Sequence, residues 1–202
     1  MNYYNKNIIK DIDPSIVLNP LFDEWLLYVE DILLSDEFQK RKFFKHHHNL
    51  SVWDHSILVS FKSFAVAKYF NASARICAIA GLLHDFYTQA WLYSEELEKI
   101  DDGKYLSEFN IKKPLFKMHG FVHGDDAAIN LEKYFPELKN DRIINSIKRH
   151  MFPLTPIPPK YKEGIIITCV DKLNSVRELP SIGLVSIKMK NVIYNKFFKK
   201  SN

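Results

Sequence analysis

The stretch SARICAIAGLLHD, residues 73–85, is apolar nearly all the way round until it ends in a histidine and an aspartate. In a helix, Ile76, Ala80 and His84 would lie on neighbouring turns. A helix that is apolar on every side is buried among other elements rather than lying on a surface. The stretch therefore predicts a central buried helix that ends in two polar side chains.

The sequence on both sides of this stretch also favours helices. Glycine is scarce, with 6 residues in 202, and alternating strand-like runs are few. The β-branched run GIIITCVD, residues 164–171, is followed by KLNSVREL with helical spacing, so we assign both to one buried helix rather than to a strand. Four prolines in PLTPIPP, residues 153–159, exclude a helix there. Other helices are expected at residues 14–44, 52–70, 125–134 and 141–150, within 95–118, and from residue 182.

Length and composition indicate a single globular domain. The chain has 202 residues, of which 47% are hydrophobic and 26% are charged, so one core can bury most of its apolar surface. We expect residues 1–202 to form one all-α domain, a compact helical bundle. Cys77 and Cys169 lie in apolar surroundings, which predicts two buried thiols in a reducing compartment rather than a disulfide. There is no signal-peptide pattern and no run of 18 apolar residues, which predicts a cytoplasmic protein that does not enter a membrane.

The net charge is +4, and lysines gather near the C-terminus at Lys188, Lys190, Lys196, Lys199 and Lys200. We interpret them as the solvated face of the last helix. A basic helical protein that binds RNA is an alternative that explains these lysines. It leaves the histidines of the chain without an explanation, so we do not expect a nucleic-acid partner.

Histidines and aspartates recur at or near the ends of the expected helices, at His55, His84, Asp85, His119, His123, His150 and Asp171. Side chains from several helices of a bundle can converge on a metal ion in its interior. Asp171 is informative because it follows an apolar run, where an unpaired buried carboxylate costs several kcal/mol. Its partner is a metal ion or, in the alternative, Arg149 or Lys172. Imidazole and carboxylate ligands together suit Fe, Mn, Zn, Ni or Co.

These residues occur in a fixed order along the chain: one histidine, a His-Asp pair, two further histidines and a final aspartate. This order resembles that of the HD superfamily of metal-dependent phosphohydrolases. Five segments carry the resemblance over residues 46–178: DHSILVSFKSFAVAKYF (54–70), AIAGLLHDF (78–86), HGFVHGDDAAINLEKYF (119–135), IKRHMFPLTPIPP (147–159) and TCVDKLNSVRE (168–178). They are most similar to a group of bacterial HD proteins with an upstream HHH. The resemblance implies an HD-domain helical bundle with helical additions at both ends.

The same resemblance implies a site with two divalent metal ions. His55, His84, Asp85 and Asp171 would hold one ion, and His123 and His150 would hold a second, with Asp85 as the catalytic bridge. His123 is preferred to His119 as the ligand because His123 lies at the start of the helix expected from about residue 125. His119 lies in the preceding loop, where the backbone would be less fixed. His119, Arg149 and Lys172 would contact the substrate, although a surface charge explains Arg149 and Lys172 equally well. His46, His47 and His48 are interpreted as a polar loop, from which one residue could reach the cleft.

Two such ions would activate a hydroxide for attack on a phosphate ester or anhydride. The resemblance to dinucleoside-tetraphosphate hydrolases of this superfamily implies a nucleotide or a related small phosphate substrate. Cyclic di-GMP is disfavoured because HDFYTQAW, residues 84–91, lacks the glycine and lysine that follow the His-Asp pair in that branch. A non-catalytic, metal-containing nucleotide sensor is the alternative, and a homodimer is left open.

Overall fold

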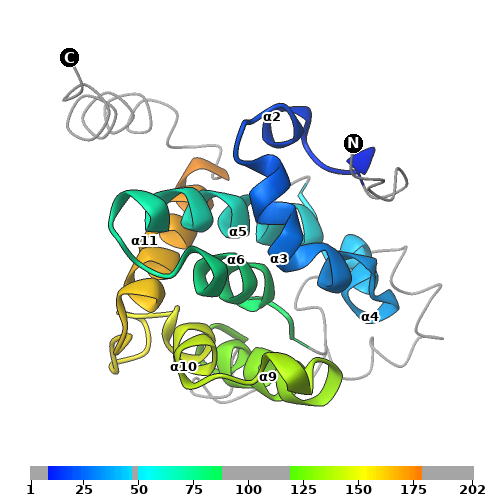
Figure 1. Cartoon of the computed structure of the whole chain (residues 1–202). Helices are drawn as coiled ribbons and strands as arrows, with labels where there is room; N and C mark the ends of the chain where they lie inside the picture. Colours follow the sequence, from blue (N-terminus) through cyan, green and yellow to red (C-terminus); the bar gives the residue numbers. More distant parts are fainter. Residues whose placement is uncertain (1–8, 47–49, 88–118, 179–202) are drawn as a thin grey trace, which may run out of the picture.

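Helices form the framework of the chain in the computed structural model, which describes residues 9–46, 50–87 and 119–178 (Figure 1). They are α2 (Pro14–Val17), α3 (Phe22–Leu34), α4 (Asp36–Gln39), the 3-10 helix η1 (Lys40–Phe43), α5 (Val52–Tyr69), α6 (Ala74–Leu83), α9 (His119–Tyr134), the 3-10 helix η3 (Pro136–Leu138), α10 (Asp141–Arg149) and α11 (Lys162–Glu178). Within the described ranges, the only pairing of extended chain is an isolated bridge between Lys45 and Ser51. The expected all-α fold class is confirmed.

Helix α6 lies at the centre of the packing and contacts α3, α5, α9, α10 and α11 (Figure 1). It packs closely against α5, where a Cβ atom on Gly81 would lie 3.0 Å from the Cα atom of Ser60. The Ser60 hydroxyl donates to the carbonyl of Ala78 at 2.7 Å and accepts from Nε1 of Trp25 at 2.8 Å. These contacts fix α6 against α5 and α3, as expected for the central buried helix.

Local sequence signals set the ends of α5 and α6. Ser51 and Asp54 form a reciprocal capping box at the start of α5, and Ser73 caps α6 through its hydroxyl. Between the two helices, Asn71 adopts a left-handed backbone conformation with φ of 51°. The expected helix at 52–70 and the strand-like run in α11 are both helical as predicted.

Two helix boundaries differ from expectation. Residues 14–44 do not form one helix, because the chain turns after α2 and Ser35 starts a new helix by accepting from the Phe38 amide at 3.2 Å. Helix α9 begins at His119 instead of near residue 125. A Cβ atom on Gly124 would lie 3.1 Å from the carbonyl oxygen of Ile147, so glycine lets α9 approach α10 closely. The helices expected within 95–118 and from residue 182, with the lysine cluster, lie outside the described residues.

The carboxylate of Glu163 joins the start of α11 to two other helices. It is 2% exposed, and its Oε1 accepts from the backbone N–H of Ser73 at 3.0 Å and from Nη1 of Arg142 at 3.3 Å. Ser73 precedes α6 and Arg142 lies in α10. One buried side chain therefore sets how α6, α10 and α11 meet.

We expect Glu163→Ala to lower the free energy of unfolding by about 1 to 3 kcal/mol, because the Ser73 N–H loses its acceptor. Chemical denaturation followed by circular dichroism measures the change. Arg142→Ala is the control, because its side chain is 51% exposed and such an ion pair contributes about 1 kcal/mol or less. Equal losses in the two variants would contradict a special role for the Ser73 contact.

The two cysteines have different environments, so the expectation that both are buried is wrong for one of them. Cys77 is buried in α6, whereas Cys169 is exposed on the outer face of α11. The expectation for Cys169 rested on its apolar neighbours in the sequence. Successive residues of a helix face different directions, so apolar neighbours do not imply that Cys169 itself is buried. Burial, and then the nearby Glu163, raise the pKa of the Cys77 thiol to about 12.

We therefore expect one thiol per folded chain to react with a disulfide reagent at neutral pH, and two after unfolding. Absorbance of the released chromophore counts them. The variant Cys169→Ser should show no fast-reacting thiol when folded. Rapid reaction in that variant would contradict the burial of Cys77.

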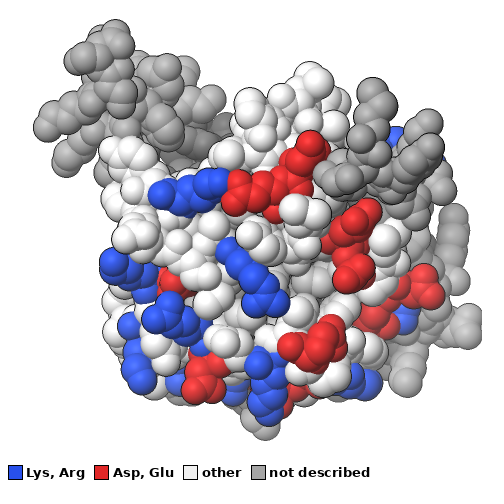
Figure 2. Space-filling view, in the orientation of Figure 1, with Lys and Arg blue, Asp and Glu red and all other residues white. Residues whose placement is uncertain are grey.

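Basic and acidic side chains are interspersed on the face shown in Figure 2. A nucleic-acid site is expected instead to gather lysine and arginine on one face. None of the helices in the described part of the chain has both the length and the apolar character needed to cross a bilayer.

Candidate metal centre

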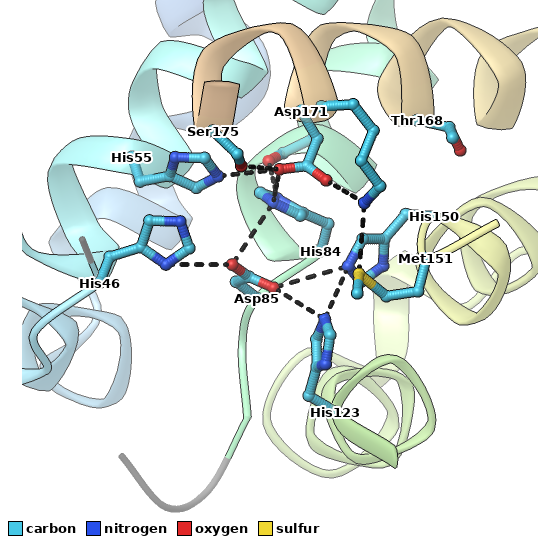
Figure 3. A network of polar contacts seen from close by, with 12 residues as sticks. His46, His55, His84, Asp85, His123, His150, Met151, Thr168, Asp171 and Ser175 are labelled. Atoms are coloured by element: carbon cyan, nitrogen blue, oxygen red, sulfur yellow. Dashed lines mark hydrogen bonds and ion pairs between the residues drawn. The ribbon is translucent and has the colours of Figure 1, made fainter. Parts of the chain in front are cut away.

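Side chains from five helical segments meet in one buried cluster (Figure 3). α5 supplies a histidine, the end of α6 supplies the His-Asp pair, and α9, α10 and α11 supply one side chain each. The six residues are no more than 4% exposed, and they are His55, His84, Asp85, His123, His150 and Asp171. The structure thus brings together all six side chains that the sequence proposed as ligands.

One half of the cluster surrounds Asp171, and we call it the Asp171 half. The Nε2 atom of His55 lies 3.1 Å from Oδ1 of Asp171, and Nε2 of His84 lies 3.7 Å from the same oxygen. Nε2 of His84 is also 3.6 Å from Oδ2 of Asp85. Two imidazoles and two carboxylates therefore point their ligand atoms at one small region.

The other half, which we call the His150 half, lies on the opposite oxygen of Asp85. Oδ1 of Asp85 is 3.4 Å from Nε2 of His123 and 3.6 Å from Nε2 of His150. The two histidine nitrogens are 2.8 Å apart. Asp85 therefore presents one carboxylate oxygen to each half (Figure 3).

Backbone carbonyls orient two of the imidazoles. His84 and His150 each follow the last residue of a helix, where carbonyl groups lack partners within the helix. Nδ1 of His84 lies 2.8 Å from the Gly81 carbonyl, and Nδ1 of His150 lies 2.7 Å from the Ile147 carbonyl. Each Nδ1–H donates to its carbonyl, which leaves the Nε2 lone pair facing the cluster, as in metal-binding histidines.

Besides hydrogen bonds such as those between His55 and Asp171 and between His123 and His150, the arrangement has features of a metal site. Nε2 of His84 is buried without a hydrogen-bond partner among the described residues, although two carboxylate oxygens lie near it. Ligand atoms that sit about 2.0 to 2.2 Å from one ion are roughly 3 to 4 Å apart. Ligand atoms within 4.8 Å of one another occur in three described groups: His46, His55 and Asp85; His55, His84 and Asp171; His84, Asp85 and His150. The cluster could therefore hold a metal ion.

The electrostatics favour ionised carboxylates and neutral imidazole in this interior. Burial alone would raise the pKa of Asp85, but His84 and then His123, His46 and His150 hold it well below its ordinary value. Burial likewise opposes ionisation of Asp171, but the hydrogen bond with His55, together with the nearby His84 and Lys172, holds its pKa well below its ordinary value. Burial, followed by His123 and His84, lowers the pKa of His150 to about 3. At neutral pH the His150 imidazole therefore has no second proton for a metal to displace.

The three residues proposed to contact a substrate have different positions. Nζ of Lys172 lies 2.7 Å from Oδ2 of Asp171 and 3.3 Å from Sδ of Met151, so a lysine partner for Asp171 exists beside the histidines. Arg149 is partly buried at the end of α10, and none of the cluster contacts described above involves it. His119 is the first residue of α9, and its side chain lies outside the described part of the chain.

One histidine that the sequence assigned to a polar loop lies against the cluster. His46 is 7% exposed, and its ring packs on His55 with 3.9 Å between centroids. Its Nδ1 is 3.8 Å from Oδ2 of Asp85. His47 and His48 lie outside the described residues. The run of three histidines was the only sequence signal for this placement.

Comparison of the chain with protein-family models, curated proteins and solved structures gave no significant match.

Proposed function

We propose that this protein is a metal-dependent phosphohydrolase of the HD superfamily, with two divalent transition-metal ions in the buried cluster. The observation that carries the proposal is the convergence of six histidine and aspartate side chains from five helical segments, with Asp85 between the two halves. These donors suit iron or manganese, and also zinc, nickel or cobalt. A purely structural polar cluster would be expected to pair its buried nitrogens, whereas Nε2 of His84 has no hydrogen-bond partner among the described residues.

The residues divide into two ligand sets that share one carboxylate. His55, His84 and Asp171 would hold one ion with Oδ2 of Asp85, and His123 and His150 would hold the other with Oδ1 of Asp85. When bound, such ions supply a hydroxide nucleophile at neutral pH and positive charge that stabilises a phosphoryl transition state. The chain itself fixes the histidine tautomers through the Gly81 and Ile147 carbonyls.

Lys172 supports a phosphate as the substrate group. Its side chain is 37% exposed, yet its ammonium group reaches Asp171 at the edge of the buried cluster. A cation between solvent and a metal centre can bind a phosphoryl oxygen and neutralise its charge. The substrate class we propose is a nucleotide or a related small phosphate ester or anhydride.

The decisive experiment measures metal content and then hydrolysis. Protein purified under anaerobic conditions without chelator or added metal is analysed by elemental mass spectrometry, and we expect close to two ions per chain. A panel of phosphate esters, nucleotides and dinucleoside polyphosphates then identifies the substrate through phosphate release and product chromatography. Protein stripped with chelator and then dialysed is the control.

Each result bears on a different part of the proposal. A metal content near zero would contradict the metal centre, and a content near one would exclude the two-ion arrangement. Bound metal with no turnover of any panel member, but with tight nucleotide binding, would favour the non-catalytic sensor.

A further inference from the structure

The placement of His46 points to a function beyond the six ligands proposed above. His46 lies just before α5, and backbone hydrogen bonds connect residues 44 and 46 to residues 50 and 52 at the start of that helix. The His46 N–H donates to the Leu50 carbonyl at 2.9 Å, and the Val52 N–H donates to the Phe44 carbonyl at 2.7 Å. The bridge between Lys45 and Ser51 belongs to the same pairing. The backbone of His46 is therefore fixed relative to the helix that carries His55.

We propose that His46 is a seventh ligand of the metal centre, which binds the ion of the Asp171 half. The proposal rests on the metal centre in the proposed function and extends its ligand set. His46, His55 and Asp85 place ligand atoms within 4.8 Å of one another. His46 faces Oδ2 of Asp85, the same oxygen that lies 3.6 Å from Nε2 of His84 (Figure 3).

The distance between His46 and Asp85 distinguishes a shared metal ion from a direct hydrogen bond. The 3.8 Å between Nδ1 of His46 and Oδ2 of Asp85 exceeds the range of a hydrogen bond. It is close to the 3.6 and 3.7 Å that separate Nε2 of His84 from its two carboxylate oxygens. Spacings of this size fit atoms that bind the same ion from different sides.

Packing on His55 does not by itself explain a histidine at this position. The rings of His46 and His55 are 3.9 Å apart and inclined by 30°, a contact that phenylalanine could also make. Histidine differs from phenylalanine here by its ring nitrogens, of which Nδ1 faces Oδ2 of Asp85. The Asp171 half would then have three imidazole and two carboxylate ligands, which favours a transition metal over Mg²⁺ or Ca²⁺.

The test replaces His46 with phenylalanine, which keeps the ring and removes both nitrogens. Metal-free wild-type protein and His46→Phe are titrated with Co²⁺ under anaerobic conditions, by calorimetry and by visible absorption. We expect the affinity for one of the two ions to fall at least tenfold, with a changed Co²⁺ spectrum because the ion loses a nitrogen ligand. The second affinity and the helical circular dichroism should be unchanged. His47→Phe, changed in the same run of histidines, is the matched control.

Three outcomes separate this proposal from the proposed function. Wild-type affinity and spectrum in His46→Phe would overturn the ligand assignment alone, as would an equal effect of His47→Phe. Failure of wild-type protein to bind Co²⁺ at all would overturn both proposals. Normal Co²⁺ binding with the expected loss in His46→Phe, but no hydrolysis of any phosphate substrate, would support His46 and reject the hydrolase.

Discussion

Asp85→Ala is expected to abolish metal binding and hydrolysis while the protein remains helical. Asp85 lies between the two halves of the cluster, with one oxygen within 3.6 Å of His84 and the other within 3.6 Å of His150. Its loss removes negative charge from both ions and should release them together. Removal of a helix-end carboxylate with no metal role would change the free energy of unfolding by about 1 kcal/mol or less.

Melting curves with and without Mn²⁺ measure this difference. A ligand at 100 times its dissociation constant stabilises the folded protein by about 2.7 kcal/mol. Stabilisation of this size should raise the melting temperature of the wild-type protein when Mn²⁺ is added. The melting temperature of Asp85→Ala should not rise. Asp31→Ala, which removes an exposed aspartate of α3, should retain the full rise. Unchanged metal-dependent stabilisation and unchanged turnover in Asp85→Ala would contradict the bridging role.

His123→Ala is expected to reduce the metal content from about two ions to about one and to lower turnover by roughly 100-fold or more. His123 lies 3.4 Å from Asp85 and 2.8 Å from His150, so its removal leaves the His150 half with one imidazole. The Asp171 half keeps all of its ligands. Elemental analysis and steady-state kinetics measure the two effects.

His119→Ala is the matched comparison, because it removes a histidine from the same helix, one turn away. It should retain about two ions. Loss of the second ion in His119→Ala, with retention in His123→Ala, would reverse the assignment of the ligand within HGFVH.

The sequence predicted the helices whose signals are local. The apolar run of α6, with its polar end, placed a central helix and the His-Asp pair correctly. Helical spacing after Asp171 outweighed the β-branched residues before it, and α11 is one helix. Such periodicity depends on residues a few positions apart, so it is visible in the sequence.

The start of one helix was expected near residue 125, whereas α9 already includes His119 and the two glycines of HGFVHG. Glycine costs about 1 kcal/mol in a helix relative to alanine. Here a Cβ atom on Gly120 would lie 3.1 Å from Cδ2 of Leu154, and one on Gly124 would lie 3.1 Å from the Ile147 carbonyl oxygen. At Gly124, where the neighbouring atoms are backbone of α10, tertiary packing therefore favours glycine although local propensity argues against a helix.

The position of His46 could not be predicted for a related reason. The hydrogen bond between His46 and Leu50 and the bridge between Lys45 and Ser51 turn the chain back toward α5. Isolated bridges have no periodic pattern in sequence. The run HHH therefore did not indicate where its side chains point, and the contact of His46 with the cluster followed only from the fold.

The contact between His55 and Asp171 joins residues that are 116 positions apart. During synthesis, a nascent chain cannot complete the Asp171 half until Asp171 has left the ribosome. Contacts between residues so far apart in sequence slow folding, because the entropy of loop closure is lost before the contact can form. The proposed metal site would therefore be complete only after folding has brought these two residues together, so we expect metal loading to be a late step in the maturation of the chain.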